Sequence, residues 1–195
     1  MMLIFAGHDT TAYQISWIMV ELSRNPHVVV NLRKELDQVF TLKSPTECDM
    51  EKLSELEYLS KIIKEGMRLW PVAPSLNREL VCDLPYKDFI IPQGSICVIS
   101  LYAMSRHGIS NPNEMIPERW DETNPEITKL NNIFMPFALG KRNCVGQALA
   151  MIELKLVLAT LYYYYDFELV TEVVDEFSIT LKPRNADFRV TYRVK

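Results

Sequence analysis

A single cysteine between two glycines has the clearest potential for chemistry in this sequence. Residues 137–146 read FALGKRNCVG and precede an apolar, helical stretch. A helix beginning near Gly146 would direct its N-terminal N–H groups at the Cys144 sulfur and favour the thiolate. Gly140 and Gly146 would allow the backbone to approach a flat ligand closely. A lone thiolate of this kind suits an iron centre that is held by one cysteine.

Two other interpretations of Cys144 follow from the residues alone. A free cysteine at the start of a helix is commonly a small buried hydrophobic residue with a structural role. Alternatively, the chain is a helical scaffold whose thiol binds another metal. Zinc is disfavoured in that case, because no second Cys or His lies at ligand spacing from Cys144.

Residues 137–146 resemble the haem loop of the cytochrome P-450 family of haem-thiolate monooxygenases, which reads Phe-x-x-Gly-x-Arg-x-Cys-x-Gly. The five fixed positions are matched by Phe137, Gly140, Arg142, Cys144 and Gly146. The resemblance implies that Cys144 is the axial ligand of a haem b iron. It also implies that Phe137 shields the sulfur from water and that Arg142 binds a haem propionate through a charge-assisted hydrogen bond.

Arg78 lies where this family often places a second propionate-binding arginine. Its alternative role is that of a solvated loop cation. On the sulfur side of the haem, Lys141 and Lys155 would form a basic patch for an acidic electron donor, a flavoprotein reductase or a ferredoxin. The alternative is that both are ordinary surface lysines.

A second motif, AGHDTT, covers residues 6–11. A glycine followed by an acid and a hydroxyl is a place where a helix can open, because Ser and Thr hydroxyls compete for backbone carbonyls. It resembles the family's oxygen groove, which implies that Thr10 contacts the oxygen being activated and that Asp9 relays protons to it. His8 falls at a variable position and is expected to be neither ligand nor base. The alternative is that Asp9 and Thr10 cap a helix N-terminus.

A third motif is Glu65-Gly66-Met67-Arg68, which places Glu65 and Arg68 on one helix face. The motif resembles the family's Glu-x-x-Arg, whose partner is a later arginine in a Pro-x-Arg segment. Residues 117–120 read PERW, so Arg119 is expected to complete an ion triad with Glu65 and Arg68. We interpret this triad as structural rather than catalytic.

Length and composition indicate an ordinary globular domain. The chain has 195 residues, 48% of them hydrophobic and 24% charged, and its net charge of −4 argues against nucleic-acid binding. Its four cysteines are widely separated, which argues against a disulfide framework. The first six residues are apolar but too few to span a bilayer. We therefore expect one domain over residues 1–195, with neither a signal peptide nor an anchor.

Hydrophobic periodicity and turn residues predict a helix-rich chain with small antiparallel sheets. Pro92-Gln93-Gly94-Ser95 is expected to form a type I turn that joins two strands into a hairpin. Loops are expected over 41–49 and, mostly irregular, over 108–132. The expected helices cover 3–22, 26–39, 58–69 and 146–162, the hairpin strands 89–91 and 96–99, and the closing strands 167–170, 177–181 and 188–194.

The resemblance covers the chain from Ala6 onward but only the C-terminal part of the family's fold, which is mainly α with small antiparallel β-sheets. It implies a monooxygenase that inserts one oxygen atom from O₂ into an apolar substrate, lined in part by residues 6–11 and 72–76. A non-catalytic remnant, or a haem-binding fragment that needs a missing N-terminal half, is the alternative. In that case the apolar residues 15–22 would lose their packing surface and form an exposed patch. Full-length relatives sit on the endoplasmic reticulum membrane, so the compartment stays open.

Overall fold

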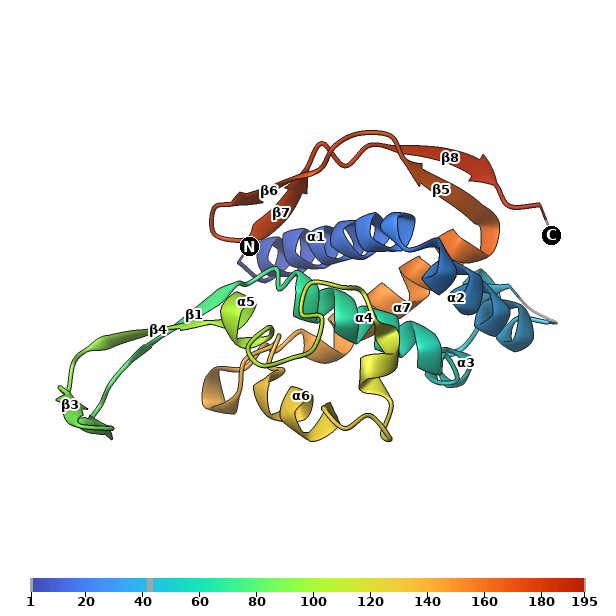
Figure 1. Ribbon diagram of the computed structural model, residues 1–195. Coiled ribbons are helices and arrows are strands. Elements are labelled where there is room, and N and C mark those ends of the chain that lie inside the picture. The colour runs from blue at the N-terminus through green and yellow to red at the C-terminus, as the bar shows by residue number, and fades with distance from the viewer. Residues whose placement is uncertain (1, 42–43, 195) are drawn as a thin grey trace.

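The computed structural model describes residues 2–41 and 44–194, and it is a helical body crossed by two-stranded antiparallel ribbons (Figure 1). None of the described helices is long and apolar enough to cross a membrane. The α-helices are α1 (Met2–Arg24), α2 (Pro26–Val39), α3 (Met50–Ser54), α4 (Glu57–Leu69), α5 (Leu101–Met104), α6 (Ile127–Ile133) and α7 (Gln147–Tyr164). Short 3₁₀ turns are η1 (Pro45–Glu47), η2 (Pro117–Trp120) and η3 (Gly140–Arg142).

The strands form four separate ribbons. β1 (Ser75–Glu79) pairs with β4 (Ile96–Ser100), and β2 (Leu84–Tyr86) pairs with β3 (Phe89–Ile91). β5 (Tyr165–Leu169) pairs with β8 (Phe188–Tyr192), and β6 (Val174–Phe177) pairs with β7 (Leu181–Arg184). In Figure 1 the first two ribbons project from the helical body, whereas the last two arch over α1.

The core lies where α1, α4 and α7 meet. Their facing side chains are almost free of solvent contact, as in Ile18, Ile62 and Leu158, each 0% exposed. Gly66 is required at the crossing of α1 and α4, because a Cβ there would lie 2.4 Å from Cγ1 of Ile18. The helices therefore pack closely at one residue inside the third sequence motif.

Two tryptophans join α1 to its neighbours. The rings of Trp17 and Trp70 stack with centroids 3.9 Å apart and planes 3° from parallel. Trp17 Nε1 donates to the carbonyl of Leu181 at the start of β7, and Trp70 Nε1 donates to Glu21 Oε1 at 3.0 Å. These contacts hold α1 between α4 and the β6–β7 ribbon.

The expected exposure of residues 15–22 is wrong. Trp17, Ile18, Val20 and Leu22 are each 0% exposed, because α4 and α7 pack on one side of α1 and β7 contacts another. The apolar side chains of this segment are therefore buried by other elements of the described chain.

The four expected helices are present with small shifts at their ends, and the short helices α3, α5 and α6 were not expected. The short helix α3 is capped by Asp49, whose carboxylate accepts from the backbone N–H of Lys52 at 3.0 Å. A helix of little more than one turn is too short to show hydrophobic periodicity. The sequence pattern therefore did not indicate α3.

One strand pairing, one turn type and one strand were predicted wrongly. Ile96–Ser100 pairs with Ser75–Glu79 and not with Phe89–Ile91, and the polar residues of 75–79 gave no sign of a strand. The turn before β4 has Gly94 at φ +81° as third residue of Pro92–Ser95, which is the type II signature rather than type I. Residues 178–180 form the turn between β6 and β7 rather than the middle of a strand.

Candidate functional site

The segment before α7 forms a closed loop around Cys144. The backbone N–H of Cys144 donates to the carbonyl of Phe137 at 2.9 Å, and that of Asn143 donates to Gly140 at 3.1 Å. Gly146 is the N-cap of α7, so the sulfur lies two residues ahead of that helix start. Cys144 is exposed, which excludes its interpretation as a buried structural thiol.

The backbone of this loop is unusual at two residues. Ala138 has φ +58° and Gly140 has φ +79°, which is the left-handed region. A Cβ built on Gly140 would meet no atom within 4 Å, so open space lies beside the backbone at that position. A Cβ built on Gly146, by contrast, would lie 3.8 Å from Cys144 Sγ, so Gly146 is the glycine that lies beside the sulfur.

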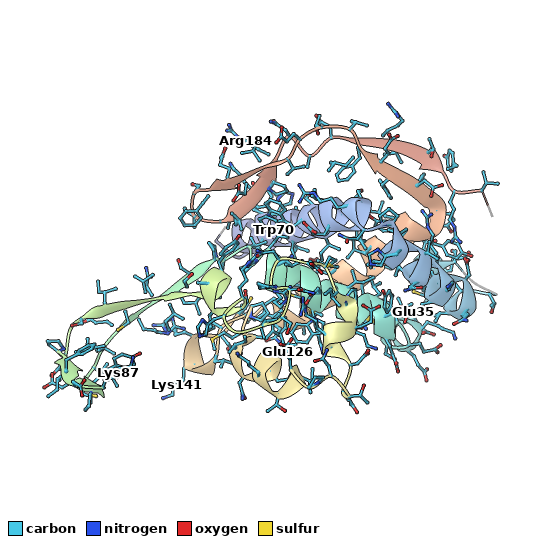
Figure 2. The ribbon with its side chains drawn as sticks, viewed as in Figure 1. Glu35, Trp70, Lys87, Glu126, Lys141 and Arg184 are labelled. Carbon is cyan, nitrogen blue, oxygen red and sulfur yellow. The ribbon has the colours of Figure 1, made fainter. Side chains whose placement is uncertain are left out.

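Apolar side chains near Cys144 are left in contact with solvent. Leu139, Val145 and Leu149 are 66%, 88% and 60% exposed, although Phe137 packs against the core. Figure 2 shows Lys141 at the edge of the molecule, on the segment between α6 and α7. Exposed aliphatic groups around a solvent-accessible thiol are typical of a surface that a flat apolar group covers.

Asp9 and Thr10 lie inside α1, which runs without interruption from Met2 to Arg24. Their interpretation as an N-cap is therefore wrong, and so is the expected opening of the helix at Gly7. Thr10 Oγ1 donates to the carbonyl of Ala6 at 2.7 Å, as expected for a hydroxyl that competes for backbone acceptors. The exposed His8 contacts Asp9, with Nδ1 2.9 Å from Oδ1.

The third motif forms a buried ionic network in which Glu65, at 0% exposure, is the centre. Glu65 Oε1 accepts from Arg68 Nη2 at 2.9 Å, from Arg119 Nε at 3.0 Å and from the Ile116 N–H at 3.2 Å. Oε2 accepts from Arg68 Nε at 2.9 Å and from Trp120 Nε1 at 3.0 Å. Both carboxylate oxygens are therefore satisfied without solvent.

Trp120 is the member of this network that the sequence pattern missed. Its indole is 5% exposed and packs beside Phe134, with ring centroids 4.6 Å apart. Its position directly after Arg119 was the available signal, because a buried Trp normally finds a partner for its N–H. The network ties α4 to η2 and thereby holds the segment that leads toward the cysteine loop.

Comparisons with known proteins identify the family of this chain. The sequence pattern of the family described as Cytochrome P450 matches residues 1–189. This chain belongs to the cytochrome P450 family. It is 35% identical over 169 residues to human Cytochrome P450 4F12, and these are 84% of this chain and 32% of that protein. Against Cytochrome P450 3A27 of Oncorhynchus mykiss it is 33% identical, with 95% of this chain and 35% of the relative covered.

A solved structure confirms the P450 fold. The crystal structure of a Cytochrome P450 (CYP102L1) superposes with a TM-score of 0.89 at 28% identity, over 97% of this chain and 44% of that one. The expected fold class, mainly α with small antiparallel sheets, is confirmed. The chain spans about a third of the length of the curated P450 relatives that it matches.

The residues present fit the haem of a P450. Cys144 offers one exposed sulfur, and a haem iron can be held by a single cysteine. Arg142 is exposed, and none of the described residues pairs with its guanidinium. Arg78 lies on β1 and donates to the carbonyl of Asn77 at 2.9 Å. Both arginines thus retain donors for haem carboxylates.

Lys155 does not belong to an exposed basic patch. Its Nζ donates to the carbonyl of Leu53 at 3.1 Å, and burial lowers the pKa of its ammonium group. Lys141 is exposed at the edge of the cysteine loop (Figure 2). Of the two lysines that were expected to form a docking patch, only Lys141 is therefore exposed.

Proposed function

We propose that this chain is the haem-ligating C-terminal part of a monooxygenase that inserts one atom of O₂ into an apolar organic substrate. One observation carries the proposal: Cys144 is exposed and lies two residues before the N-cap of α7, in a chain of the P450 family. The sulfur therefore lies beside the N-terminal end of α7 and is open to a ligand.

Each residue of the loop has a defined part in binding the cofactor. Cys144 Sγ would ligate the iron of haem b, and Arg142 would bind one propionate with Arg78 as candidate for the other. Gly140 and Gly146 leave main chain bare where the macrocycle would lie. Held by a thiolate, haem would supply the chemistry that inserts one atom of O₂ into a C–H bond, while electrons from a donor and protons reduce the other atom to water.

Asp9 and Thr10 would supply the protons for that reaction. The hydroxyl of Thr10 donates to Ala6 and keeps its lone pairs free to accept a proton. To pass a proton on, Thr10 Oγ1 must release the Ala6 carbonyl and turn toward the haem side of α1. Asp9, partly buried beside His8, is the acid that would restore that proton.

Substrate and electrons would reach the site from different sides. Residues 6–11 and 72–76 would line an apolar substrate pocket, in which Val72 is 6% exposed. Electrons would come from a flavoprotein reductase or a ferredoxin that docks beside Lys141. Both parts of the proposal rest on the family's use of such partners, in relatives of which this chain matches about a third.

The test is the spectrum of the carbon monoxide complex. The 195-residue chain is purified with haem, reduced and exposed to carbon monoxide, and a red-shifted Soret band of a thiolate-ligated carbonyl is expected. Cys144→Ala should abolish the band. Cys82→Ala is the matched control, because Cys82 is also an exposed free thiol but lies in the projecting ribbon, and it should leave the band intact.

Two outcomes would overturn the proposal. A wild-type chain that binds haem without the red-shifted band would show that the thiolate is not the ligand. A wild-type chain that binds no haem would leave the alternative of a non-catalytic remnant or of a fragment that needs its missing half.

A further inference from the structure

A recess of about 230 Å³ lies on the other end of the molecule from the cysteine loop. It forms where α1 ends, α2 begins and α7 leads into β5, a junction visible in Figure 1. Apolar side chains make most of its wall, among them Leu22, Val29 and Phe167. It shares no residue with segment 137–146.

Unpartnered polar atoms gather at this recess. Among the side chains of residues 6–41 and 44–194, four buried atoms have no hydrogen-bond partner, and three of them belong to residues that line the recess. These three atoms are Ser23 Oγ, Arg33 Nε and Tyr162 Oη. Buried donors without partners are rare in folded proteins, because each one loses its hydration without replacement. Their concentration at one recess therefore points to a missing acceptor.

Tyr162 is the most deeply placed of the three, at 2% exposure. Burial raises the pKa of its phenol, although the nearby Arg33 charge opposes that shift. The hydroxyl is accordingly a neutral donor at ordinary pH. It suits a neutral acceptor such as a carbonyl oxygen.

The charge at the recess is already balanced. Arg33 Nη2 lies 2.5 Å from Asp166 Oδ1 and donates to the carbonyl of Tyr165 at 2.9 Å. A ligand carboxylate would meet repulsion from Asp166, whereas a neutral oxygen would meet donors and no opposing charge. The recess is larger than the roughly 150 Å³ cavity known to hold benzene and smaller than the 300–1,000 Å³ typical of drug-sized ligands. A single-ring molecule fits this range.

We propose that this recess is a second binding site, for a small neutral molecule with one carbonyl oxygen on a compact apolar body. Tyr162 and Arg33 supply donors to the carbonyl oxygen, and the aliphatic wall covers the ring. Because the recess is separate from the cysteine loop, ligand binding there does not depend on haem binding. Cys144→Ala should therefore leave binding at the recess unchanged.

The test uses three probes of matched shape, followed by NMR of backbone amides in the 195-residue chain. Cyclohexanone has the acceptor, methylenecyclohexane replaces it by carbon, and cyclohexanecarboxylate adds a charge. We expect cyclohexanone to shift amides of residues 22–33 and 162–167 and to bind about tenfold more tightly than methylenecyclohexane, the effect of one hydrogen bond to a buried donor.

Two variants and one control locate the site. Tyr162→Phe should reduce the preference for cyclohexanone over methylenecyclohexane to about twofold or less. Val30→Trp places a large ring at the rim, where Val30 is 54% exposed, and should abolish binding of both. Val98→Trp is the matched control, since Val98 is 66% exposed on the distant β4, and it should change nothing.

The proposal fails if cyclohexanone causes no shifts in the wild-type chain, or if the shifts persist in Val30→Trp. It also fails if cyclohexanecarboxylate binds more tightly than cyclohexanone, because the recess would then be an anion site. Equal binding of cyclohexanone and methylenecyclohexane to the wild-type chain would show that the unpartnered donors do not contribute to affinity.

Discussion

Arg119 Nε donates to Glu65 Oε1 at 3.0 Å across 54 positions of sequence, and both side chains are almost fully buried. Five donors surround the Glu65 carboxylate, and three of them come from residues that no helical spacing relates to it, Ile116, Arg119 and Trp120. The contact joins α4 to η2. We propose that this network is structural and supports the haem loop without touching the cofactor.

Removal of Glu65 should therefore destabilise the fold. Glu65→Ala leaves the buried guanidinium of Arg68 without a carboxylate partner and leaves Arg119 with only Glu126, 3.6 Å from its Nη1. We expect a loss of about 3–5 kcal/mol of unfolding free energy. Urea denaturation followed by circular dichroism measures this loss. Glu55→Ala is the control, because its ion pair with Lys52 is exposed and is worth about 0–1 kcal/mol. Equal effects of the two substitutions would contradict the buried network.

Gly140 should matter for haem binding beyond its backbone conformation. Gly140 and Gly94 have φ of +79° and +81°, and a Cβ at either position would meet no atom within 4 Å. Alanine should cost each site a similar 1–2 kcal/mol, because L-residues avoid this region. We expect Gly140→Ala, and not Gly94→Ala, to lower the haem content of the purified chain. Matched haem content in both variants would show that no macrocycle lies against Gly140.

Loss of the Tyr162 hydroxyl should stabilise the unliganded protein. Tyr162 Oη is buried and has no partner among the described residues, so Tyr162→Phe removes a desolvated polar group and keeps the ring contacts. A gain of about 1 kcal/mol in unfolding free energy is expected from urea denaturation. Tyr58→Phe provides the contrast, because it deletes a hydroxyl that donates to Glu118 Oε1 at 3.0 Å and should not stabilise. A loss of stability in Tyr162→Phe would mean that the hydroxyl has a partner in solution.

Tyr58 should make stability fall in alkaline solution. Burial, together with the hydrogen bond to Glu118, raises its pKa from 10.0 to about 12. The unfolded chain therefore loses this proton first, so the contribution of Tyr58 to stability is complete below about pH 10 and is lost as pH rises toward 12. Unfolding free energies of wild type and Tyr58→Phe, compared across that window, isolate the effect. Parallel pH profiles for the two proteins would contradict it.

Local features of the molecule were predictable from the residues themselves. The helix ends at Pro26 and Trp70 follow from backbone sterics and lie within a residue or two of the prediction. The cysteine loop was recognisable because its glycines, arginine and cysteine all lie within the ten consecutive residues 137–146. The contact of Glu65 with Arg68 follows from helical spacing alone.

Features that join distant segments required the tertiary structure. Strand pairing of 75–79 with 96–100 was missed because polar residues can form an edge ladder through backbone atoms, which no side-chain pattern reports. The burial of α1 and the indole of Trp120 depended on which elements pack together. The recess between α1, α2 and α7 brings Arg33 to Tyr165 across 132 positions. Spacing along a chain determines what one helix or loop presents, whereas packing in three dimensions decides which of those groups keep a partner.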